Sequence, residues 1–258
     1  MTDATPRQAV ILAAGFGRRL EEARARPKAL VEIHGRSILE RAIAALERHG
    51  TRAITIVIGH HGAQIVDYVA ARTGSARIDV VWNHDFATTD SAYSLWCARQ
   101  SLGAGAIVMN GDVVVADRAL HAAIPTRREQ SLWLGTRAQP GDDGWMLALG
   151  PDRRVLGLEV VRSPAARIDA HLLKSAGVLS FSARDGRSLA SWLDRAVQNG
   201  HIDCHFDEIL RRHLVEIELE GAEIDRSSWA EIDYAADLQR ARQVFAPEAR
   251  RGGDGTRT

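Results

Sequence analysis

Short uninterrupted apolar runs alternate with helical patterns through the first 120 residues, and this alternation constrains the fold more than any other feature. We predict strands at 8–12, 53–58, 78–82 and 106–109, and helices at 38–50, 63–71 and 93–102. An uninterrupted apolar run is typical of a strand that is buried on both faces. Strands that alternate with helices pair in parallel through right-handed crossovers, so we expect a parallel sheet flanked by helices.

The pattern changes after residue 125. We predict strands at 131–137, 145–149, 155–161, 176–181, 215–220 and 229–232, and helices at 189–199, 206–214 and 235–245. The Gly-Pro-Asp turn at 150–152 joins two of these strands and predicts an antiparallel pair. The expected fold class is therefore α/β, with a single mixed, mainly parallel sheet, an antiparallel excursion and one domain over residues 1–245. Residues 246–258 show no apolar period, and we expect a disordered tail there.

Charge and composition exclude several classes of protein. The 258 residues include 33 basic and 33 acidic side chains, a balance unlike that of strongly basic nucleic-acid-binding proteins. No apolar run approaches the roughly 18 residues of a membrane span, and the polar start of the chain leaves no room for a signal peptide. The two cysteines, Cys97 and Cys204, lie far apart, as is typical of a reduced chain. We therefore expect a cytoplasmic enzyme that binds neither nucleic acid nor membranes.

A glycine loop, LAAGFGRRL at 12–20, follows the first predicted strand. Gly15 and Gly17 let the backbone approach a phosphate, and consecutive amides there form an anion nest. The dinucleotide fingerprint needs a third glycine where Leu20 stands, and no lysine follows either glycine as a P-loop requires, so both common nucleotide loops are excluded. Pro27 constrains the chain just ahead of Lys28, which we expect to aim its ammonium group at the loop.

This loop, together with PKAL at 27–30, resembles the L-x-x-G-x-G-x-R-L and P-K signature of nucleotidyltransferases of the sugar-nucleotide pyrophosphorylase superfamily. The resemblance continues in the expected order through FATTDSAYSLW at 86–96, NGD at 110–112, Trp145, SAGV at 175–178, FD at 206–207 and EID at 231–233. It covers about residues 8–245 and is strongest toward short bacterial cytidylyltransferases that act on choline phosphate and on phosphonates. It implies a Rossmann-like, GT-A-like fold.

The resemblance also implies an activity, namely transfer of CMP from CTP to a small phosphonate or phosphomonoester with release of pyrophosphate. It assigns Lys28 and Arg18 to charge stabilisation at the reacting phosphorus. It assigns nucleotide binding to Leu12, Ala13, Ala14, Gly15, Gly17, Asp90, Ser94 and Gly111. The acceptor phosphate is largely dianionic at pH 7, so the chemistry needs no protein nucleophile.

Two aspartates are candidate metal ligands. Asp112 follows the strand at 106–109, at the carboxyl end where parallel sheets bind ligands, although Asn110-Gly111 beside it is also an ordinary turn sequence. Asp233 precedes a helix, where an N-cap is the alternative role. The resemblance implies that these two carboxylates hold Mg²⁺ against the triphosphate, and hard oxygen ligands suit that ion.

The resemblance further implies an acceptor site formed by Tyr93, Trp145, Lys174, His205, Phe206 and Asp207. Aromatic faces and a carboxylate suit a quaternary ammonium such as choline, although aromatic residues more often pack in a core. Gly144 stands where choline-phosphate enzymes tend to carry an acid, and Lys174, His201 and His205 add positive charge. We therefore expect an acceptor with a second anionic group rather than a bare trimethylammonium.

Several alternatives stay open at this point. One is a choline-phosphate cytidylyltransferase, and another is a sugar-1-phosphate nucleotidyltransferase that uses a different NTP. A glycosyltransferase of related fold would need Asp-x-Asp where Asn110-Gly111-Asp112 stands. A nucleotide-binding module without chemistry would have no need for Lys28, Asp112 and Asp233 together. A zinc site at His201, Cys204 and His205 lacks a second ligand pair, and a homodimer is possible.

Overall fold

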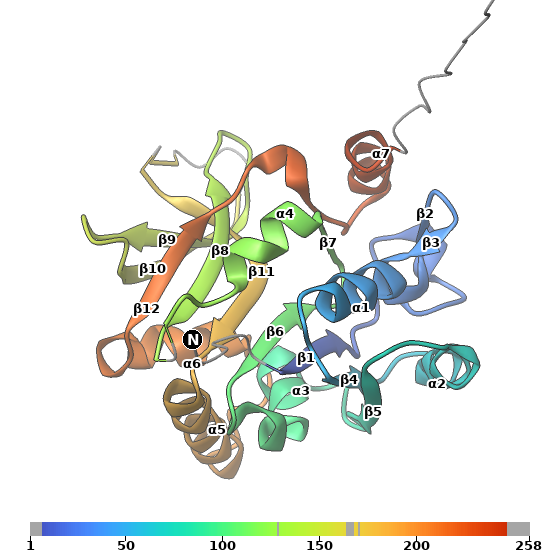
Figure 1. Ribbon diagram of the computed structural model, residues 1–258, viewed down its shortest axis with the longest axis horizontal. Coiled ribbons are helices and arrows are strands. Elements are labelled where there is room, and N and C mark those ends of the chain that lie inside the picture. Colours follow the sequence, from blue (N-terminus) through green and yellow to red (C-terminus); the bar gives the residue numbers. More distant parts are fainter. Residues whose placement is uncertain (1–6, 128, 164–167, 170, 247–258) are drawn as a thin grey trace, which may run out of the picture.

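The central sheet places its parallel strands in the middle of the molecule and its antiparallel strands at one side (Figure 1). The computed structural model describes residues 7–127, 129–163, 168–169 and 171–246, so the predicted disordered tail lies outside the described residues except for residue 246. The strands are β1 Gln8–Ala13, β2 Glu32–Ile33, β3 Arg36–Ser37, β4 Ala53–Ile58, β5 Arg77–Trp82, β6 Ala106–Asn110, β7 Val113–Val115, β8 Ser131–Arg137, β9 Gly144–Leu149, β10 Val155–Val161, β11 Leu173–Phe181, β12 Leu219–Glu223 and β13 Trp229–Glu231. The helices are α1 Ile38–Arg48, α2 Gly62–Ala71, α3 Ser91–Cys97, α4 Asp117–Leu120, α5 Ala183–Gln198, α6 Phe206–His213 and α7 Ala235–Val244.

The strand order confirms the predicted fold class. The sheet runs β10-β9-β11-β6-β1-β4-β5, with β8 paired to β11 and β12 paired to β8. Strands β6, β1, β4 and β5 are parallel, whereas β11 pairs antiparallel with β6, β8 and β9. The antiparallel excursion predicted after residue 125 is therefore the β8–β11 part of the same sheet.

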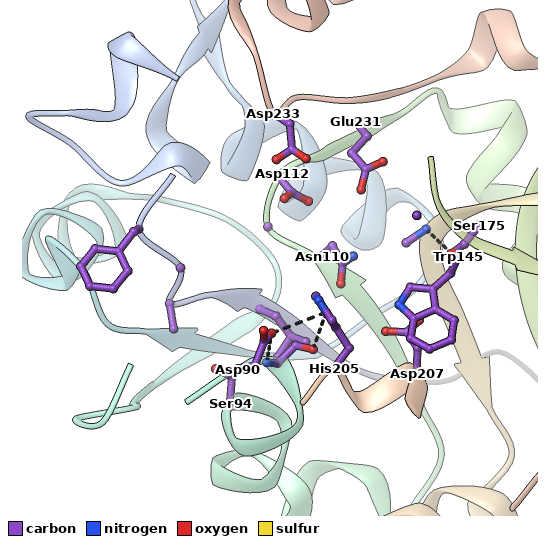
Figure 2. Close-up of a pocket in the computed structure, with 18 of the residues that line it drawn as sticks. Asp90, Ser94, Asn110, Asp112, Trp145, Ser175, His205, Asp207, Glu231 and Asp233 are labelled. Atoms are coloured by element: carbon purple, nitrogen blue, oxygen red, sulfur yellow. Dashed lines mark hydrogen bonds and ion pairs between the residues drawn. The ribbon is translucent and has the colours of Figure 1, made fainter. Parts of the chain in front are cut away.

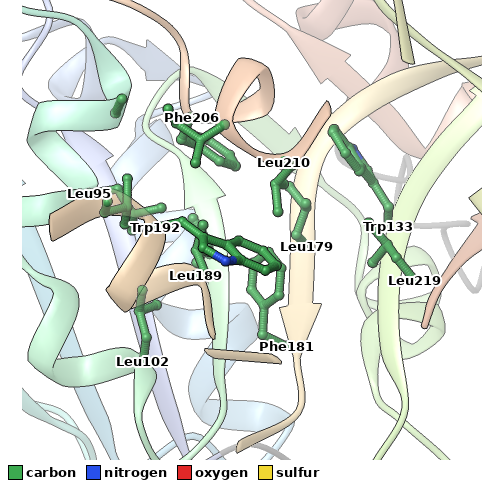
Figure 3. Close-up of a cluster of buried hydrophobic side chains, with 14 of the residues drawn as sticks. Leu95, Leu102, Trp133, Leu179, Phe181, Leu189, Trp192, Phe206, Leu210 and Leu219 are labelled. Atoms are coloured by element: carbon green, nitrogen blue, oxygen red, sulfur yellow. The ribbon is translucent and has the colours of Figure 1, made fainter. Parts of the chain in front are cut away.

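Both faces of the parallel strands β6, β1 and β4 are buried, which explains their apolar sequences, whereas the edge strand β5 is partly exposed. One face packs against α3, α5 and α6 in a cluster that contains Val10, Val57 and Val108 (Figure 3). The opposite face, with Ile11 and Ile56, packs against α1 and α4. Successive strand side chains point to opposite faces, so each strand must be apolar at every position to be covered on both sides.

Some predicted boundaries were wrong for identifiable reasons. Helix α5 begins at Ala183 rather than at 189, because the Ser182 hydroxyl caps it by accepting from the Asp185 amide. The strand predicted at 215–220 begins only at Leu219, because residues Leu214–Glu216 form a 3₁₀ turn. The helix predicted at 93–102 begins at Ser91 and gives way to a 3₁₀ turn at Arg99–Leu102.

Three short elements that the sequence did not predict complete the fold. They are the β2–β3 hairpin, helix α4 and strand β7, which pairs antiparallel with β13 outside the central sheet. A third apolar cluster joins the glycine loop to this small sheet through Leu20, Val114 and Ile232. This packing holds the segment from Leu20 to Ile38 against the segment from Ala230 to Ala241, beside the central sheet. No helix among the described residues is long and apolar enough to cross a bilayer.

Helix α5 lies so close to Leu102, the last residue of the 3₁₀ turn at Arg99–Leu102, that only glycine fits at position 186. A Cβ atom on Gly186 would lie 2.1 Å from the Leu102 carbonyl oxygen, whereas one on Gly103 would meet only the Arg187 side chain at 3.9 Å. Helix propensity alone predicts that Gly186→Ala stabilises the protein by about 1 kcal/mol. We expect the opposite, a loss of about 1–3 kcal/mol in the free energy of unfolding, because a backbone carbonyl must move.

Urea unfolding checks this prediction, with Gly103→Ala as the matched control. We expect the control to stay within about 0.5 kcal/mol of the wild type. A Gly186→Ala variant as stable as that control would show that the contact between α5 and residue 102 is not tight.

Candidate active site

A cavity of about 520 Å³ opens at the carboxyl ends of β1, β5 and β6, where parallel sheets place their ligands (Figure 2). Its lining residues come from several chain segments and include Leu12, Ala14, Gly15, Arg19, Asn83, Thr89, Asp90, Ser91, Ser94, Asn110, Gly111, Asp112, Asp143, Trp145, Arg162, Lys174, His205, Asp207, Glu231 and Asp233. Most predicted site residues are therefore in one place, although they span more than 200 positions of the chain.

The Lys28 ammonium group lies between two carboxylates at this cavity. Its Nζ atom is 2.8 Å from Asp112 Oδ2 and 2.6 Å from Asp233 Oδ1. Lys28 starts a 3₁₀ turn directly after Pro27, whose fixed φ sets the direction of the chain. Gly17 has a φ of +61°, and a Cβ atom there would lie 3.1 Å from the Lys28 Cβ. Glycine at position 17 thus lets the loop adopt a left-handed turn and pack directly on the lysine stem.

Asp112 and Asp233 are held together by backbone pairing rather than by their side chains. Asp112 immediately precedes β7 and Asp233 lies two residues after β13, which pairs with β7 in antiparallel fashion. The Ile232 amide donates to the Asp112 carbonyl oxygen at 3.0 Å. The two-stranded sheet therefore fixes the spacing of the two carboxylates, and buried Ile232 anchors its end.

The charges of this triad reinforce one another. Burial opposes ionisation of Lys28, but Asp112 and Asp233 outweigh it and raise the pKa of the ammonium group above its ordinary value. Burial likewise opposes ionisation of Asp233, but Lys28 and Arg19 keep the pKa of its carboxyl below the ordinary value. Lys28 and Asp233 are thus both charged at neutral pH.

Arg19, rather than Arg18, reaches the acidic pair. Its guanidinium donates to Asp233 Oδ2 at 2.8 Å and to the Tyr234 hydroxyl at 3.0 Å. The Arg18 guanidinium instead lies over the Phe16 ring, 3.9 Å from its centroid, and does not line the cavity. The signal that identifies Arg19 is in the sequence, because the arginine of the L-x-x-G-x-G-x-R-L signature falls on position 19.

The residues predicted to bind nucleotide divide into two groups. Six of them line the cavity: Leu12, Ala14, Gly15, Asp90, Ser94 and Gly111. Ala13 and Gly17 do not line it, since Ala13 belongs to the core and Gly17 supports Lys28. Gly111 is packed so closely on β1 that a Cβ atom there would lie 2.5 Å from the Leu12 carbonyl oxygen. Glycine at 111 is therefore required to bring Asp112 next to the glycine loop.

The predicted acceptor residues also divide. Trp145, Lys174, His205 and Asp207 line the cavity. Phe206 is 1% exposed in the core under α6, so the core role that aromatic residues usually have applies to it. Tyr93 does not line the cavity either, because its hydroxyl donates to Asp85 at 3.0 Å and its ring contacts Trp96.

Sequence reasoning missed an acidic residue at the centre of the cavity. Glu231 accepts from Lys174 Nζ at 2.9 Å, and both side chains are largely buried. Burial raises the pKa of the Glu231 carboxyl, while Lys174 opposes that shift. Composition held a signal for this pair, because the 33 basic residues include only two lysines: Lys174 lines the cavity, and Lys28 pairs with two aspartates that line it.

The two aspartates offer part of a Mg²⁺ site. Of the four carboxylate oxygens on Asp112 and Asp233, three accept from Lys28 or Arg19, and buried Asp112 Oδ1 has no hydrogen-bond partner among the described residues. Within the described part of the chain, no group of three or more histidine, cysteine or acidic side chains is placed to hold a metal, which also leaves the zinc alternative at residue 204 without support. Mg²⁺ commonly takes one or two carboxylates and completes its octahedron with phosphates and water.

The chain also matches a known family. Residues 9–174 match the MobA-like NTP transferase domain, which is well over half of the sequence. The chain belongs to the MobA-like NTP transferase family. The glycine loop, Lys28 and Asp112 all fall within the matched residues, whereas Asp207, Glu231 and Asp233 follow them.

Curated relatives of this NTP transferase include two full-length matches. It is 27% identical over 244 residues to a choline-phosphate cytidylyltransferase of Streptococcus pneumoniae, covering 93% of this chain and 99% of that one. It is 25% identical over 240 residues to a 2-aminoethylphosphonate cytidylyltransferase of Lancefieldella rimae, covering 92% of each. A CMP-5'-(3-aminopropyl)phosphonate synthase of Streptomyces rubellomurinus is 28% identical, and the match covers 40% of that protein.

Solved structures share the fold. A CTP:phosphocholine cytidylyltransferase from Streptococcus pneumoniae superposes with a TM-score of 0.76 at 24% identity, covering 92% of this chain and 98% of that one. An inositol-1-phosphate CTP transferase from T. maritima superposes with a TM-score of 0.75 at 17% identity, covering 94% and 96%. The central sheet and its helices are thus those of a Rossmann-like nucleotidyltransferase.

Because Lys28 occupies the carboxylate oxygens that a cation would use, we expect Lys28→Met to bind Mg²⁺ more tightly than the wild type when no nucleotide is present. Removing the ammonium leaves two acidic side chains whose repulsion a divalent cation relieves. Thermal unfolding with and without Mg²⁺ checks this, because a ligand that binds the folded state raises Tm.

Lys174→Met is the matched control, since it removes an ammonium from the neighbouring pair with Glu231. We expect the Mg²⁺-dependent rise in Tm to be larger in Lys28→Met than in the control and the wild type. Equal rises in all three proteins would show that Asp112 and Asp233 do not form a cation site.

Proposed function

We propose that this NTP transferase is a CTP-dependent cytidylyltransferase that transfers CMP to a small phosphonate or phosphomonoester and releases pyrophosphate. The observation that carries the proposal is the Lys28 ammonium between Asp112 and Asp233, at the edge of a cavity that the glycine loop also lines. The relatives named as cytidylyltransferases, which match nearly the whole chain, support CTP as the donor.

In this proposal the reaction is an in-line displacement at the α-phosphorus of CTP. An acceptor oxygen forms the new P–O bond, and the bond from the α-phosphorus to the bridging oxygen of the β-phosphate breaks as pyrophosphate leaves. The acceptor phosphate or phosphonate is already anionic, so no side chain needs to remove a proton. The protein therefore contributes position and charge rather than a nucleophile.

Lys28 and Arg19 are assigned to the triphosphate. Both cations sit beside the glycine loop, where they can stabilise negative charge that builds on the phosphate oxygens during transfer. Asp112 and Asp233 are assigned to hold Mg²⁺, which when bound neutralises phosphate charge and orients the leaving pyrophosphate. The backbone of residues 12–15 is assigned to the nucleoside, and the role predicted for Arg18 is assigned to Arg19, on which the arginine of the signature falls.

The acceptor is assigned to the part of the cavity with Trp145, Lys174 and Asp207. Burial raises the pKa of the Asp207 carboxyl to about 6, against the opposing charges of His205 and Lys174, so this acid is ionised at pH 7. An aromatic face beside a carboxylate suits an ammonium group. We assign the acceptor's cationic end to Trp145 and Asp207 and its phosphonate to Lys174.

This assignment differs from the acceptor with a second anionic group that the sequence favoured. That expectation counted Lys174 and the histidines as unmatched positive charge. Glu231 pairs with Lys174 at 2.9 Å, and Asp143 lines the cavity together with Arg162, so Lys174 is no longer an unmatched positive charge. An amino-bearing phosphonate fits best, and phosphocholine is the second candidate because Trp145 offers it an aromatic face.

Pyrophosphate release with each of four NTPs, Mg²⁺ and a panel of acceptors tests the proposal. The panel contains 2-aminoethylphosphonate, phosphocholine, phosphonoacetate and glucose 1-phosphate. We expect turnover with CTP and an amino-bearing acceptor. Turnover only with the sugar phosphate and another NTP would support the sugar-1-phosphate alternative, and nucleotide binding without turnover would support the binding module.

Lys28→Ala and Asp112→Ala should each lower kcat by about a hundredfold or more, because each removes a contact that is strongest when charge builds at the α-phosphorus. Steady-state kinetics with CTP check this. The matched controls are Arg36→Ala and Glu40→Ala, which break an ion pair between β3 and α1. Full activity in both site variants would remove the mechanism.

Asp207→Asn should raise KM for the acceptor, measured with 2-aminoethylphosphonate, by about tenfold or more, because the acceptor's cation loses its partner. KM for CTP should stay constant in the same variant. In the wild type, KM for this acceptor should rise as the pH falls through about 6, since Asp207 becomes neutral there.

Ethylphosphonate, which has no cation, separates this effect from titration of the phosphonate itself. We expect KM for ethylphosphonate to be the same in wild type and Asp207→Asn at every pH. If the variant weakens both acceptors equally, Asp207 does not recognise the cation.

A further inference from the structure

Asn83 is a buried amide at the end of β5 whose every hydrogen-bonding atom is used. It is 1% exposed. Its Oδ1 accepts from the Asp85 backbone amide at 2.9 Å, and its Nδ2 donates to Thr89 Oγ1 and to Ser94 Oγ at 3.0 Å each. Thr89 and Ser94 also line the cavity, so this network forms part of the cavity wall.

The orientation of this amide is determined by its neighbours. A backbone N–H can only donate, so the Asn83 atom that faces the Asp85 amide must be the oxygen. The amide nitrogen therefore faces the two hydroxyls and gives each of them one hydrogen. Thr89 in turn donates its own proton to the Asp85 carbonyl oxygen at 2.8 Å, which can only accept.

Ser94 is left with a proton to donate. Its oxygen already accepts from Asn83, and none of the described residues accepts from its hydroxyl. The proton therefore turns away from Asn83, toward the cavity that Ser94 lines. Of the hydroxyls that Asn83 contacts, only that of Ser94 is a free donor.

This donor lies at the end of the cavity away from the triphosphate machinery. Figure 2 shows Asp90 and Ser94 together on one side of the site, with Asp112 and Asp233 on the opposite side. A nucleotide whose phosphates reach Lys28 and the glycine loop extends its base toward the Ser94 side.

We propose that Asn83 is a positioning residue for base selection, because it fixes the Ser94 hydroxyl as a donor that faces the base of the bound nucleotide. The site would then select a base with a hydrogen-bond acceptor at ring position 3. Cytosine has an acceptor there, whereas uracil carries an N–H that would face the hydroxyl proton. This inference rests on the proposed function and adds the element that chooses among pyrimidine nucleotides.

Wrong polarity is costly in such a place. A buried donor that meets another donor leaves both without a partner, which disfavours the wrong base by more than the gain from the correct bond.

Measuring kcat/KM for CTP and for UTP with one acceptor tests the inference, together with calorimetric Kd values for both nucleotides. The proteins are wild type, Ser94→Ala, Asn83→Asp and the double variant. In Asn83→Asp the new carboxylate oxygen accepts the Ser94 proton, so the Ser94 lone pairs face the base. We expect Ser94→Ala and Asn83→Asp each to lower the CTP/UTP ratio by about tenfold or more.

The double variant should have the same CTP/UTP ratio of kcat/KM as Ser94→Ala, because Asn83 acts through the Ser94 hydroxyl. Thr88→Val is the matched control, since it removes an exposed hydroxyl from the same loop, and its ratio should equal that of the wild type. If the buried aspartate prevents Asn83→Asp from folding, the CTP/UTP ratio of Ser94→Ala still tests the inference.

A wild-type preference for UTP, or a ratio within twofold of the wild type in Ser94→Ala, would overturn the inference. An Asn83→Asp effect that persists in the Ser94→Ala background would do so as well. These results would overturn the base-selection inference without contradicting the proposed nucleotidyl transfer. Absence of transfer from every NTP is the different outcome that overturns the proposed function.

Discussion

The site depends on one ammonium group that two carboxylates hold at the edge of a sheet. Lys28 forms short ion pairs with Asp112 and Asp233, which are far from each other in the sequence. Each partner would be costly to bury alone, since an uncompensated charge in a low dielectric is strongly unfavourable. The triad is therefore stable only when the glycine loop, the end of β6 and the strand β13 come together. In the proposed reaction, the same charges bind and neutralise phosphate.

The packing of the rest of the structure positions Lys28, Asp112 and Asp233 next to one another. The parallel strands β6, β1 and β4 are covered on both faces, so their carboxyl ends form a rigid rim. The small β7–β13 sheet and the apolar cluster around Leu20 and Ile232 then hold the last acidic residue against the glycine loop. Glycines at 17 and 111 permit the two close backbone approaches that a side chain would block.

Polar networks around the cavity give its ends different chemical characters. The Lys174–Glu231 pair is neutral as a unit and separates the acidic triad from the buried Asp207. At the other side, Asn83 accepts from the Asp85 amide and donates to the Ser94 hydroxyl oxygen, so the Ser94 proton remains available to donate. In the proposed reaction, the paired cations would bind phosphate, the acid beside an aromatic ring would bind the acceptor and the Ser94 hydroxyl would bind the base.

Local sequence predicted the central sheet, the fold class and the glycine loop, because these depend on periodicity and on spacing within short motifs, and the family resemblance singled out Lys28, Asp112 and Asp233. The tertiary structure decided which side chains meet. Arg19 rather than Arg18 reaches Asp233, Phe206 packs in the core, and Glu231 neutralises Lys174. The last two outcomes depend on packing and on a charge 57 residues away, so no local pattern contains them, whereas the arginine of the glycine-loop signature already falls on position 19. The polarity of the Ser94 hydroxyl is of the same kind, since it follows from a chain of hydrogen bonds that exists only once the fold has formed.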